Sequence, residues 1–257
     1  MVCDDLRIGG TLSSSGISGG VSINGTGIVV QDWSGLFGHV GYTLTGARVS
    51  GRPGVTLVGD ALPKERYLTL NLAFLQERRT GGSVDTNPGG YLWSNTDLVL
   101  GYLANPTGFY LEVDDPVGTR FVFCNAPDPA SIDYLRNERR AVIPLVASEP
   151  YWKVGGTETT STGTGAGSVT NTGNATVYDA IISFSGAGNY INSTAGWTIT
   201  VSSACVVDLG DRTVKVAGVN SDNLMTRTDR DWGWFEPGAN TISRSVTSTM
   251  TMRSQYD

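Results

Sequence analysis

The sequence predicts a mainly β protein with two domains, and three observations support that fold class. Glycine is abundant, with 34 copies among 257 residues, whereas only 16% of the residues are charged. This composition is typical of β proteins, since helical proteins usually contain more Glu, Lys, Leu and Ala. Short segments alternate apolar and polar residues, and turn-forming residues separate these segments at short intervals. The chain is long enough for one large domain or two ordinary domains, each with its own core.

The clearest strand lies in the N-terminal part, over residues 66–76. Leu68, Leu70, Leu72 and Phe74 occupy alternate positions in this segment. Successive side chains of a strand point to opposite faces, so these four residues share one face. We therefore expect a strand with one buried side.

A hairpin and a further strand are expected downstream of that segment. The apolar segments 109–113 and 119–124 flank the turn sequence Asp-Asp-Pro-Val-Gly at 114–118, which predicts a hairpin. Residues 141–147 return to a strand pattern, which ends at the sequence Glu-Pro-Tyr-Trp at 149–152. These segments all belong to the N-terminal domain.

One short helix is expected at residues 129–139. Asp128 fits the N-cap, the proline after it fits the first helical position, and arginines occupy the last turn. Ile132 and Leu135 give this segment a narrow apolar stripe. Residues 91–103 are also apolar, but their period fits a strand and a helix equally well.

The composition changes after Trp152. Residues 155–168 are almost wholly Gly, Thr, Ser and Ala, which is expected of a segment that links or decorates rather than packs. We therefore place a boundary near Lys153, between an N-terminal β domain, residues 1–152, and a C-terminal domain, residues 153–257.

Every element expected beyond that boundary is a strand. About six to eight short strands in about a hundred residues are typical of a β-sandwich. The sequence Asp-Leu-Gly-Asp at 208–211 predicts a tight turn in which Gly210 takes a positive φ, and Pro237-Gly238 marks another turn. The expected strands cover residues 168–170, 177–184, 196–201, 205–208, 214–216 and 240–252. The residues expected to share one face of the last strand are Ile242, Arg244, Val246, Ser248, Met250 and Met252.

Charge and cysteine content exclude several classes of protein. The net charge of −6 argues against a nucleic-acid binder, which normally carries a basic stripe. Cys3, Cys124 and Cys205 are far apart and odd in number, so neither a zinc knuckle nor a dense disulfide framework is expected. Cys124 and Cys205 lie in apolar runs and are expected to be small core residues. The acidic start and the lack of long apolar runs predict no signal peptide, no membrane partner and folding in a reducing cytoplasm.

The titratable residues do not form a recognisable catalytic set. His39 is the single histidine, so a Ser-His-Asp or Cys-His triad would need it, and a multi-histidine zinc site within the chain is excluded. Asp114 with Asp115, or Asp208 with Asp211, could act in glycoside hydrolysis. Both pairs lie in turn sequences, where Asp is the standard residue.

One loop is rich in oxygen ligands and could hold calcium, although it lacks the EF-hand spacing. Its residues are Asn220, Asp222, Asn223, Asp229 and Asp231. The glycine pairs of the chain lack the strand-to-helix context and the lysine of a phosphate-binding loop. We therefore expect no enzyme activity, catalytic residue, metal site or cofactor.

Aromatic residues support an alternative function, a carbohydrate-binding module for host-surface glycans. Aromatic rings could form a stacking platform for sugars, although aromatics on short strands are more often core or interface residues. No polar cluster accompanies these rings in the sequence. The residues concerned are Tyr151, Trp152, Tyr190, Trp197, Trp232 and Trp234.

Three short segments resemble the C-terminal domain of siphophage distal tail proteins (Dit), the siphovirus-type tail component family. They are Asn171-Thr172-Gly173-Asn174-Ala175, Val207-Asp208-Leu209-Gly210-Asp211-Arg212-Thr213-Val214 and Trp234-Phe235-Glu236-Pro237-Gly238-Ala239-Asn240-Thr241-Ile242. The strand at 66–76 and the strand that ends at 149–152 resemble the N-terminal domain of that family. The likeness spans most of the chain through short, degenerate motifs.

This resemblance implies a structural role in the virion as a minor tail protein of the tail tip or baseplate. It implies an N-terminal β domain with a helix, a C-terminal galectin-like β-sandwich, and a hexameric ring of N-terminal domains around a channel that DNA transits. The implied partners are sister subunits, the tail tube protein, the tail-tip hub or tape-measure-associated protein, and fibres or receptor-binding proteins. Residues 1–32 and 78–91 are expected to contribute to ring or tube contacts, because they are polar or Gly-rich beside strong strands. Assembly is expected in the host cytoplasm.

Overall fold

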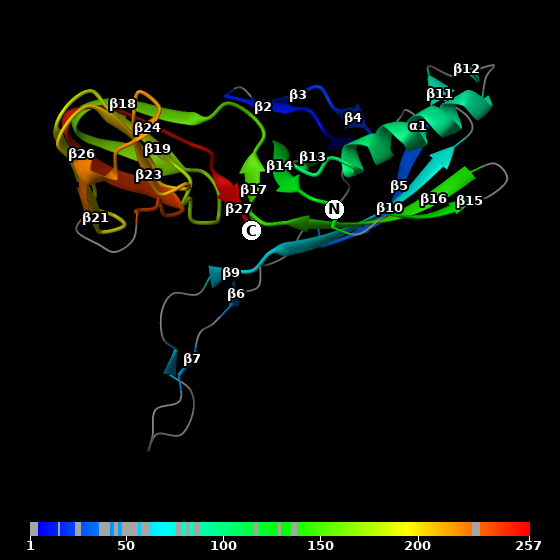
Figure 1. Cartoon of the computed structure of the whole chain (residues 1–257), viewed down its shortest axis with the longest axis horizontal. Helices are drawn as coiled ribbons and strands as arrows, with labels where there is room; N and C mark the ends of the chain where they lie inside the picture. The colour runs from blue at the N-terminus through cyan, green and yellow to red at the C-terminus, as the bar shows by residue number, and fades with distance from the viewer. Residues whose placement is uncertain are drawn as a thin grey trace. The chain divides into compact units, whose positions relative to one another are not determined.

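The computed structural model shows a mainly β chain with one α-helix, α1 (Pro88–Leu103), among the residues that it describes (Figure 1). Contacts divide the chain into two compact units. The first unit comprises Met1–Ser13, Ile17–Gly155 and Asp257, and the second comprises Ser14–Gly16 and Gly156–Tyr256. The described residues are 5–14, 16–23, 27–35, 42–43, 46–47, 56–57, 62–75, 79–80, 83–84, 88–115, 118–127, 130–134, 138–227 and 232–257.

One sheet of the first unit contains five of its strands in the order β17-β14-β13-β1-β4, with every neighbouring pair antiparallel. The hairpin expected around residues 114–118 is confirmed, since Asp115 pairs with Gly118 and Phe109 pairs with Cys124. The strands are β1 (Asp5–Ile8), β4 (Val21–Ser22), β13 (Phe109–Asp115), β14 (Gly118–Cys124) and β17 (Trp152–Val154).

The second sheet of the first unit runs in the order β15-β16-β10-β5, again antiparallel throughout. The strand expected at 66–76 is confirmed as β10, whose residues Leu68, Leu70, Leu72 and Phe74 are at most 2% exposed. Helix α1 packs against β10, and Figure 1 shows it lying over this sheet. The strands are β5 (Ile28–Ser34), β10 (Arg66–Leu75), β15 (Ser131–Tyr134) and β16 (Glu138–Ala147).

The helix expected at residues 129–139 is wrong. Residues 131–134 form β15, which pairs with β16, and β16 already begins at Glu138. The helix lies instead at Pro88–Leu103 and includes the segment 91–103 that was ambiguous in the sequence. The supposed cap residues, Asp followed by Pro, are also standard turn residues, and pairing with β16 supplies the backbone partners that a helix would otherwise provide.

Four short strand pairs complete the described part of the first 84 residues. No helix in the described ranges is long and apolar enough to cross a bilayer. The pairs are β2 (Thr11–Ser13) with β3 (Gly16–Ser18), β6 (Tyr42–Thr43) with β9 (Leu62–Pro63), β7 (Gly46–Ala47) with β8 (Thr56–Leu57), and β11 (Arg79–Thr80) with β12 (Ser83–Val84).

The second unit is built on one curled sheet in which β26 is the central strand. β26 pairs along one edge with β18, and along the other edge with β20 through residues 242–244 and with β19 through residues 248–251. The path continues as β24-β23-β22-β19 on one side of β26 and as β20-β21-β25 on the other. The strands are β18 (Thr159–Asn171), β19 (Ile181–Phe184), β20 (Gly188–Asn192), β21 (Trp197–Val201), β22 (Cys205–Asp208), β23 (Thr213–Val216), β24 (Val219–Asn220), β25 (Met225–Arg227) and β26 (Gly238–Met252), with a 3-10 turn at Asp222–Leu224; β27 (Gln255–Tyr256) follows.

The two halves of this curled sheet enclose one apolar core. The face predicted for the last strand is confirmed, because Ile242 and Met250 are fully buried, Met252 is buried, and Val246 packs against the same core. The buried core residues are Val169, Val177, Ala180, Ile182, Phe184, Tyr190, Trp197, Ile199, Val201, Cys205, Val207, Leu209, Val214, Phe235, Ile242, Met250 and Met252. The description galectin-like stays a prediction from the resemblance.

Residues 155–168 do not form the expected linker, because they contain most of β18. β18 pairs with β26 on both sides of Thr164, and the register shifts between Gly163 and Gly165, where Gly165 has a φ of +74°. Backbone hydrogen bonds do not need apolar side chains, and glycine allows the positive φ of an irregular strand at little cost. The Gly/Thr composition therefore belongs to a curled strand.

The turn predicted at residues 208–211 joins β22 and β23, but Gly210 does not take the positive φ. That conformation falls on Arg212, with a φ of +55°. A Cβ added at Gly210 would lie 3.0 Å from the Cβ of Asp179. The glycine is therefore required by the close approach of another segment, and not by its own backbone conformation.

We expect Gly165→Ala to lower the free energy of unfolding by about 1–2 kcal/mol, because an L side chain is strained at this φ. No atom of the described residues lies within 4 Å of the added Cβ, so strain is the effect tested. Gly101→Ala in α1 is the matched control, since its Cβ also meets open space, and it should raise stability by about 1 kcal/mol. Urea unfolding measures both, and the same sign for both substitutions would contradict this account.

Candidate functional site

The aspartates considered for hydrolysis lie next to turns rather than all within them: Asp114 and Asp115 end β13, Asp208 ends β22, and Asp211 lies in the turn that follows. Asp208 Oδ1 accepts a hydrogen bond from the Asp211 backbone N–H at 3.0 Å, which closes the turn between β22 and β23. Asp114 accepts a hydrogen bond from the Thr119 hydroxyl, and Asp115 ends β13. Hydrogen bonds that stabilise the turns therefore suffice to explain why Asp occurs at these positions.

The single histidine and part of the calcium loop fall outside the described ranges, namely His39, Asp229 and Asp231. Asp222 Oδ1 accepts a hydrogen bond from the Val214 backbone N–H at 3.0 Å. Within the described ranges, no three His, Cys, Asp or Glu side chains converge to hold a metal ion. The expected absence of catalytic, cofactor and metal sites stays a prediction.

Of the rings considered as a sugar platform, Tyr151 and Trp152 are buried in the first unit, and the other four belong to the core of the second unit or pack against it. Tyr190 and Trp197 are 0% and 2% exposed and stack with their centroids 5.8 Å apart. Phe235 meets both rings edge-on, at 6.5 Å and 5.7 Å. Trp232 and Trp234 are partly buried against the same cluster. Stacking on a sugar needs an exposed ring face, so the buried rings of Trp152, Tyr190 and Trp197 do not favour glycan binding.

The segment that leads into β26 is fastened to this aromatic cluster. Trp197 Nε1 donates a hydrogen bond to the Trp234 carbonyl oxygen at 2.6 Å, and Trp234 Nε1 donates to Glu236 Oε1 at 2.6 Å. Gly233 has a φ of +99°, and a Cβ there would lie 2.9 Å from the Trp197 ring. Contacts with Trp197 and within the segment therefore explain why Gly233, Trp234 and Glu236 occur at these positions.

Three buried asparagines hold turns of the second unit, and two of them lie in the motifs that resemble distal tail proteins. Asn171, Asn192 and Asn240 are at most 1% exposed. The Asn240 side chain donates to the Glu236 carbonyl at 2.7 Å and accepts from the Glu236 N–H at 3.0 Å. Asn192 Nδ2 donates to Asn240 Oδ1 at 3.2 Å, and Asn171 Nδ2 donates to the Ala175 carbonyl at 2.8 Å. Each amide satisfies backbone groups that the core would otherwise leave without partners.

Cys124 and Cys205 are buried free thiols, as predicted, whereas Cys3 lies outside the described ranges. Burial raises the pKa of the Cys124 thiol to about 12, and the charge of Arg66 opposes that rise only in part. Burial also raises the pKa of Cys205. The thiolate is the reactive form of cysteine, so both side chains are structural.

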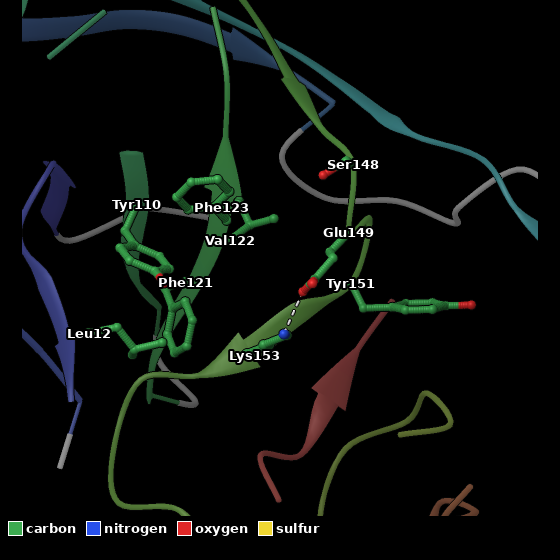
Figure 2. Close-up of a pocket in the computed structure, with 9 residues that line it drawn as sticks. All are labelled: Leu12, Tyr110, Phe121, Val122, Phe123, Ser148, Glu149, Tyr151 and Lys153. Atoms are coloured by element: carbon green, nitrogen blue, oxygen red, sulfur yellow. Dashed lines mark hydrogen bonds and ion pairs between the residues drawn. The ribbon is translucent and has the colours of Figure 1, made fainter. Parts of the chain in front are cut away.

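An aromatic pocket of about 210 Å³ lies in the first unit (Figure 2). Tyr110 meets Phe121 and Phe123 edge-on, with centroids 5.6 Å and 5.0 Å apart. Lys153 and Glu149, which Figure 2 joins by a dashed line, form an ion pair that neutralises both charges. The volume is below the roughly 300 Å³ of typical ligand pockets. The lining residues are Leu12, Tyr110, Phe121, Val122, Phe123, Ser148, Glu149, Tyr151 and Lys153.

The four-stranded sheet β15-β16-β10-β5 is the best candidate for an assembly surface. Neither β5 nor β15 has a second strand partner in the part of the chain that the structure describes. On one face of this sheet, Tyr67, Val142 and Val29 are 69%, 47% and 41% exposed. An unpaired strand edge presents backbone N–H and C=O groups that can pair with another chain.

One of these two edges was missed in the sequence, because residues 131–134 were included in the expected helix. The sequence Ser-Ile-Asp-Tyr at these positions alternates polar and apolar residues and contains a β-branched and an aromatic residue. Such residues are enriched in strands, so the period-2 signal was present. A segment of four residues is too short for that signal to outweigh the helix-cap pattern.

Comparison with solved structures shows the same fold in phage proteins. The chain is 14% identical to the SPP1 Dit (gp 19.1) protein, a paradigm of the hub adsorption apparatus in phages that infect Gram-positive bacteria, with a TM-score of 0.64. The match covers 98% of this chain and 99% of that one. The expected likeness to distal tail proteins is therefore confirmed at the level of the fold.

Two structures of the phage P2 baseplate in its activated conformation also contain a similar chain. The strontium form has 9% identity, a TM-score of 0.50 and coverage of 96% of this chain and 97% of that chain. The calcium form has 10% identity, a TM-score of 0.51 and coverage of 100% and 99%. No protein-family model and no curated protein matches this sequence.

We expect Asn240→Ala to lower the free energy of unfolding by about 1–3 kcal/mol, because it leaves partly buried backbone groups of Glu236 without their side-chain partner. Asn223→Ala is the control, since Asn223 is exposed, and it should change stability by less than about 0.5 kcal/mol. Denaturant unfolding of both variants measures the difference. Equal losses would show that the buried amide does not hold this turn.

We expect stability to fall as the pH rises above about 9, since the unfolded Cys124 thiol ionises near its ordinary pKa while the folded thiol stays protonated to about 12. The unfolded state then binds fewer protons, so the free energy of unfolding decreases with pH. Between pH 8 and 10 the loss from this group should be about 1–2 kcal/mol. Cys124→Ala should lose that much less over the same range, and identical pH profiles would contradict the assignment.

Proposed function

We propose that this chain is a structural subunit of a phage tail tip, a distal tail protein without catalytic activity. The observation that carries the proposal is a fold match along nearly the full length of both this chain and the SPP1 Dit protein. A match that extends over both units is more specific than a shared β-sandwich, which occurs in proteins of many functions. The likeness to chains of the P2 baseplate supports the same class.

Ring assembly in this proposal uses the open edges of the four-stranded sheet. The strands alternate in direction from β5 to β15, so the two edge strands run in opposite directions. Rotation about a ring axis would place β15 of one copy beside β5 of the next, and this pair would also be antiparallel. Such a contact joins two different surfaces and closes by rotation, as a cyclic assembly requires.

In our proposal one row of paired residues continues across such a contact. Val29, Ala73, Arg140 and Asp133 lie in one row across β5, β10, β16 and β15. Val29 is therefore at one edge of the sheet and Asp133 is at the other. The two side chains belong to the same exposed face, at opposite ends of the row.

The remaining partners follow from the same class of protein. In our proposal six copies form the ring in the virion, between the tail tube protein and the tail-tip hub or tape-measure-associated protein, and fibres or receptor-binding proteins attach to the second unit. DNA passes through the channel without a binding role, to which the net charge of −6 is suited. Residues 1–32 and 78–91 are proposed to add ring or tube contacts; part of each segment lies outside the described ranges. Glycan binding by the second unit remains the alternative hypothesis, which no described feature favours.

Disulfide trapping tests the ring contact. The double variant Val29→Cys/Asp133→Cys should, under mild oxidation at concentrations that support assembly, give a ladder of covalent species that ends at the hexamer. Tyr67→Cys/Asp133→Cys is the matched control, because Tyr67 is exposed on the central strand β10 rather than at an edge. The control should give no ladder, and negative-stain images of the wild-type protein should show rings.

Other outcomes would contradict this assembly in distinct ways. A covalent species that stops at the dimer would indicate a two-fold contact instead of a cyclic one. A ladder from both variants would show random collision rather than edge pairing. Rings without any trapping of the edge variant would retain the proposed class and reject the edge contact, whereas a monomer that turns over a polysaccharide would reject the class itself.

A further inference from the structure

Arg244 is a buried cation in the core face of the second unit. The side chain lies on β26, and the residue is only 7% exposed. Tyr190 of β20 is its direct cross-strand neighbour, and the guanidinium carbon lies 5.7 Å from the centre of that ring. Removing a guanidinium from water costs several kcal/mol unless other groups compensate the charge.

The groups that contact this guanidinium are all neutral. Nη2 donates a hydrogen bond to Ser161 Oγ at 2.6 Å, and Nη1 donates to the carbonyl oxygens of Ser161 and Ser248 at 3.4 Å and 3.3 Å. No carboxylate accepts a hydrogen bond from Arg244 or forms an ion pair with it in the described part of the chain. The positive charge is therefore solvated only by dipoles.

Two other arginines are equally buried, but each lies near a carboxylate. Arg253 is also 7% exposed, and its Nε lies 3.4 Å from Glu158 Oε1. Arg66 is 7% exposed as well, and its Nη2 lies 3.6 Å from Asp257 Oδ1. Both follow the rule that a buried charge is paired with an opposite one. Arg244 departs from that rule.

Three hydrogen-bond donors that have no partner among the described residues belong to Arg244 and to two residues beside it. They are Arg244 Nε, Tyr190 Oη and Ser248 Oγ, and all three atoms are buried. Burial raises the pKa of Tyr190 to about 12, and the Arg244 charge opposes this rise, so the hydroxyl carries its proton at neutral pH. A guanidinium N–H and two hydroxyl groups can all donate to one acceptor that carries no proton.

We propose that Arg244 holds a small monatomic anion of the chloride class, with Tyr190 and Ser248 as the other donors. The anion balances the buried charge and accepts the hydrogen bonds that the protein leaves unmade. A monatomic anion is favoured over a larger oxyanion because all three donor atoms are buried. This site does not depend on the proposed role in the phage tail.

The full-length protein tests the site through its thermal stability. Melting is measured by scanning calorimetry in about 150 mM sodium chloride and in sodium gluconate of the same ionic strength, because gluconate is too large for the site. Binding to the folded state alone raises the melting temperature, and an increase of about 2–4 °C in chloride is expected. Arg244→Met should lose this dependence on chloride, and Arg253→Met, with equal burial, should keep it.

Bromide locates the ion directly. Crystals of the full-length protein soaked in sodium bromide should give an anomalous peak within about 3.5 Å of Arg244 Nε. If Arg244→Met does not fold, Tyr190→Phe replaces it in the thermal assay and should reduce the chloride effect, because one donor is lost. The absence of a bromide peak at Arg244, or an unchanged chloride effect in the Arg244 or Tyr190 variant, would overturn the proposal.

Discussion

The structure depends on one constraint, that each backbone N–H and C=O group of a strand must find a partner. In the second unit a single strand, β26, provides backbone hydrogen-bond partners for three other strands, β18, β19 and β20. Because β26 has partners in both halves of the sheet, the sheet must curl. The irregular register at Gly163 and Gly165 lies in β18, which pairs with β26. The core then forms between the two halves.

The same constraint gives the first unit its potential for assembly. In the described ranges, β5 and β15 end a four-stranded sheet with their outer backbone groups unpaired, and the directions of these two strands suit a continued antiparallel arrangement. A fold held by backbone pairing and alternating burial tolerates extensive change of side chains. This explains how chains only 14% identical can share nearly their whole fold.

Polar groups inside the second unit have two different roles. Asn171, Asn192 and Asn240 satisfy backbone groups of turns, so the motifs that resemble distal tail proteins contain structural residues. Arg244 instead brings a full charge into the core with neutral partners, and it is the feature that points to a ligand. The aromatic rings beside it, Tyr190 and Trp197, are packing residues. The hydrogen-bond partners of each buried polar group therefore indicate whether the group has a structural role or points to a ligand.

The sequence by itself determined the elements whose signals are local. The alternation in β10 and β26, the turn at 114–118 and the buried thiol Cys124 all follow from side-chain periodicity and turn residues that lie close together in the chain. Tertiary structure decided the others. Residues 131–134 became a strand because β16 lies beside them, and the Gly-rich segment became β18 because β26 offers it a continuous partner. It also decided which carboxylates lie near the buried arginines, since a local pattern does not contain the positions of groups distant in sequence.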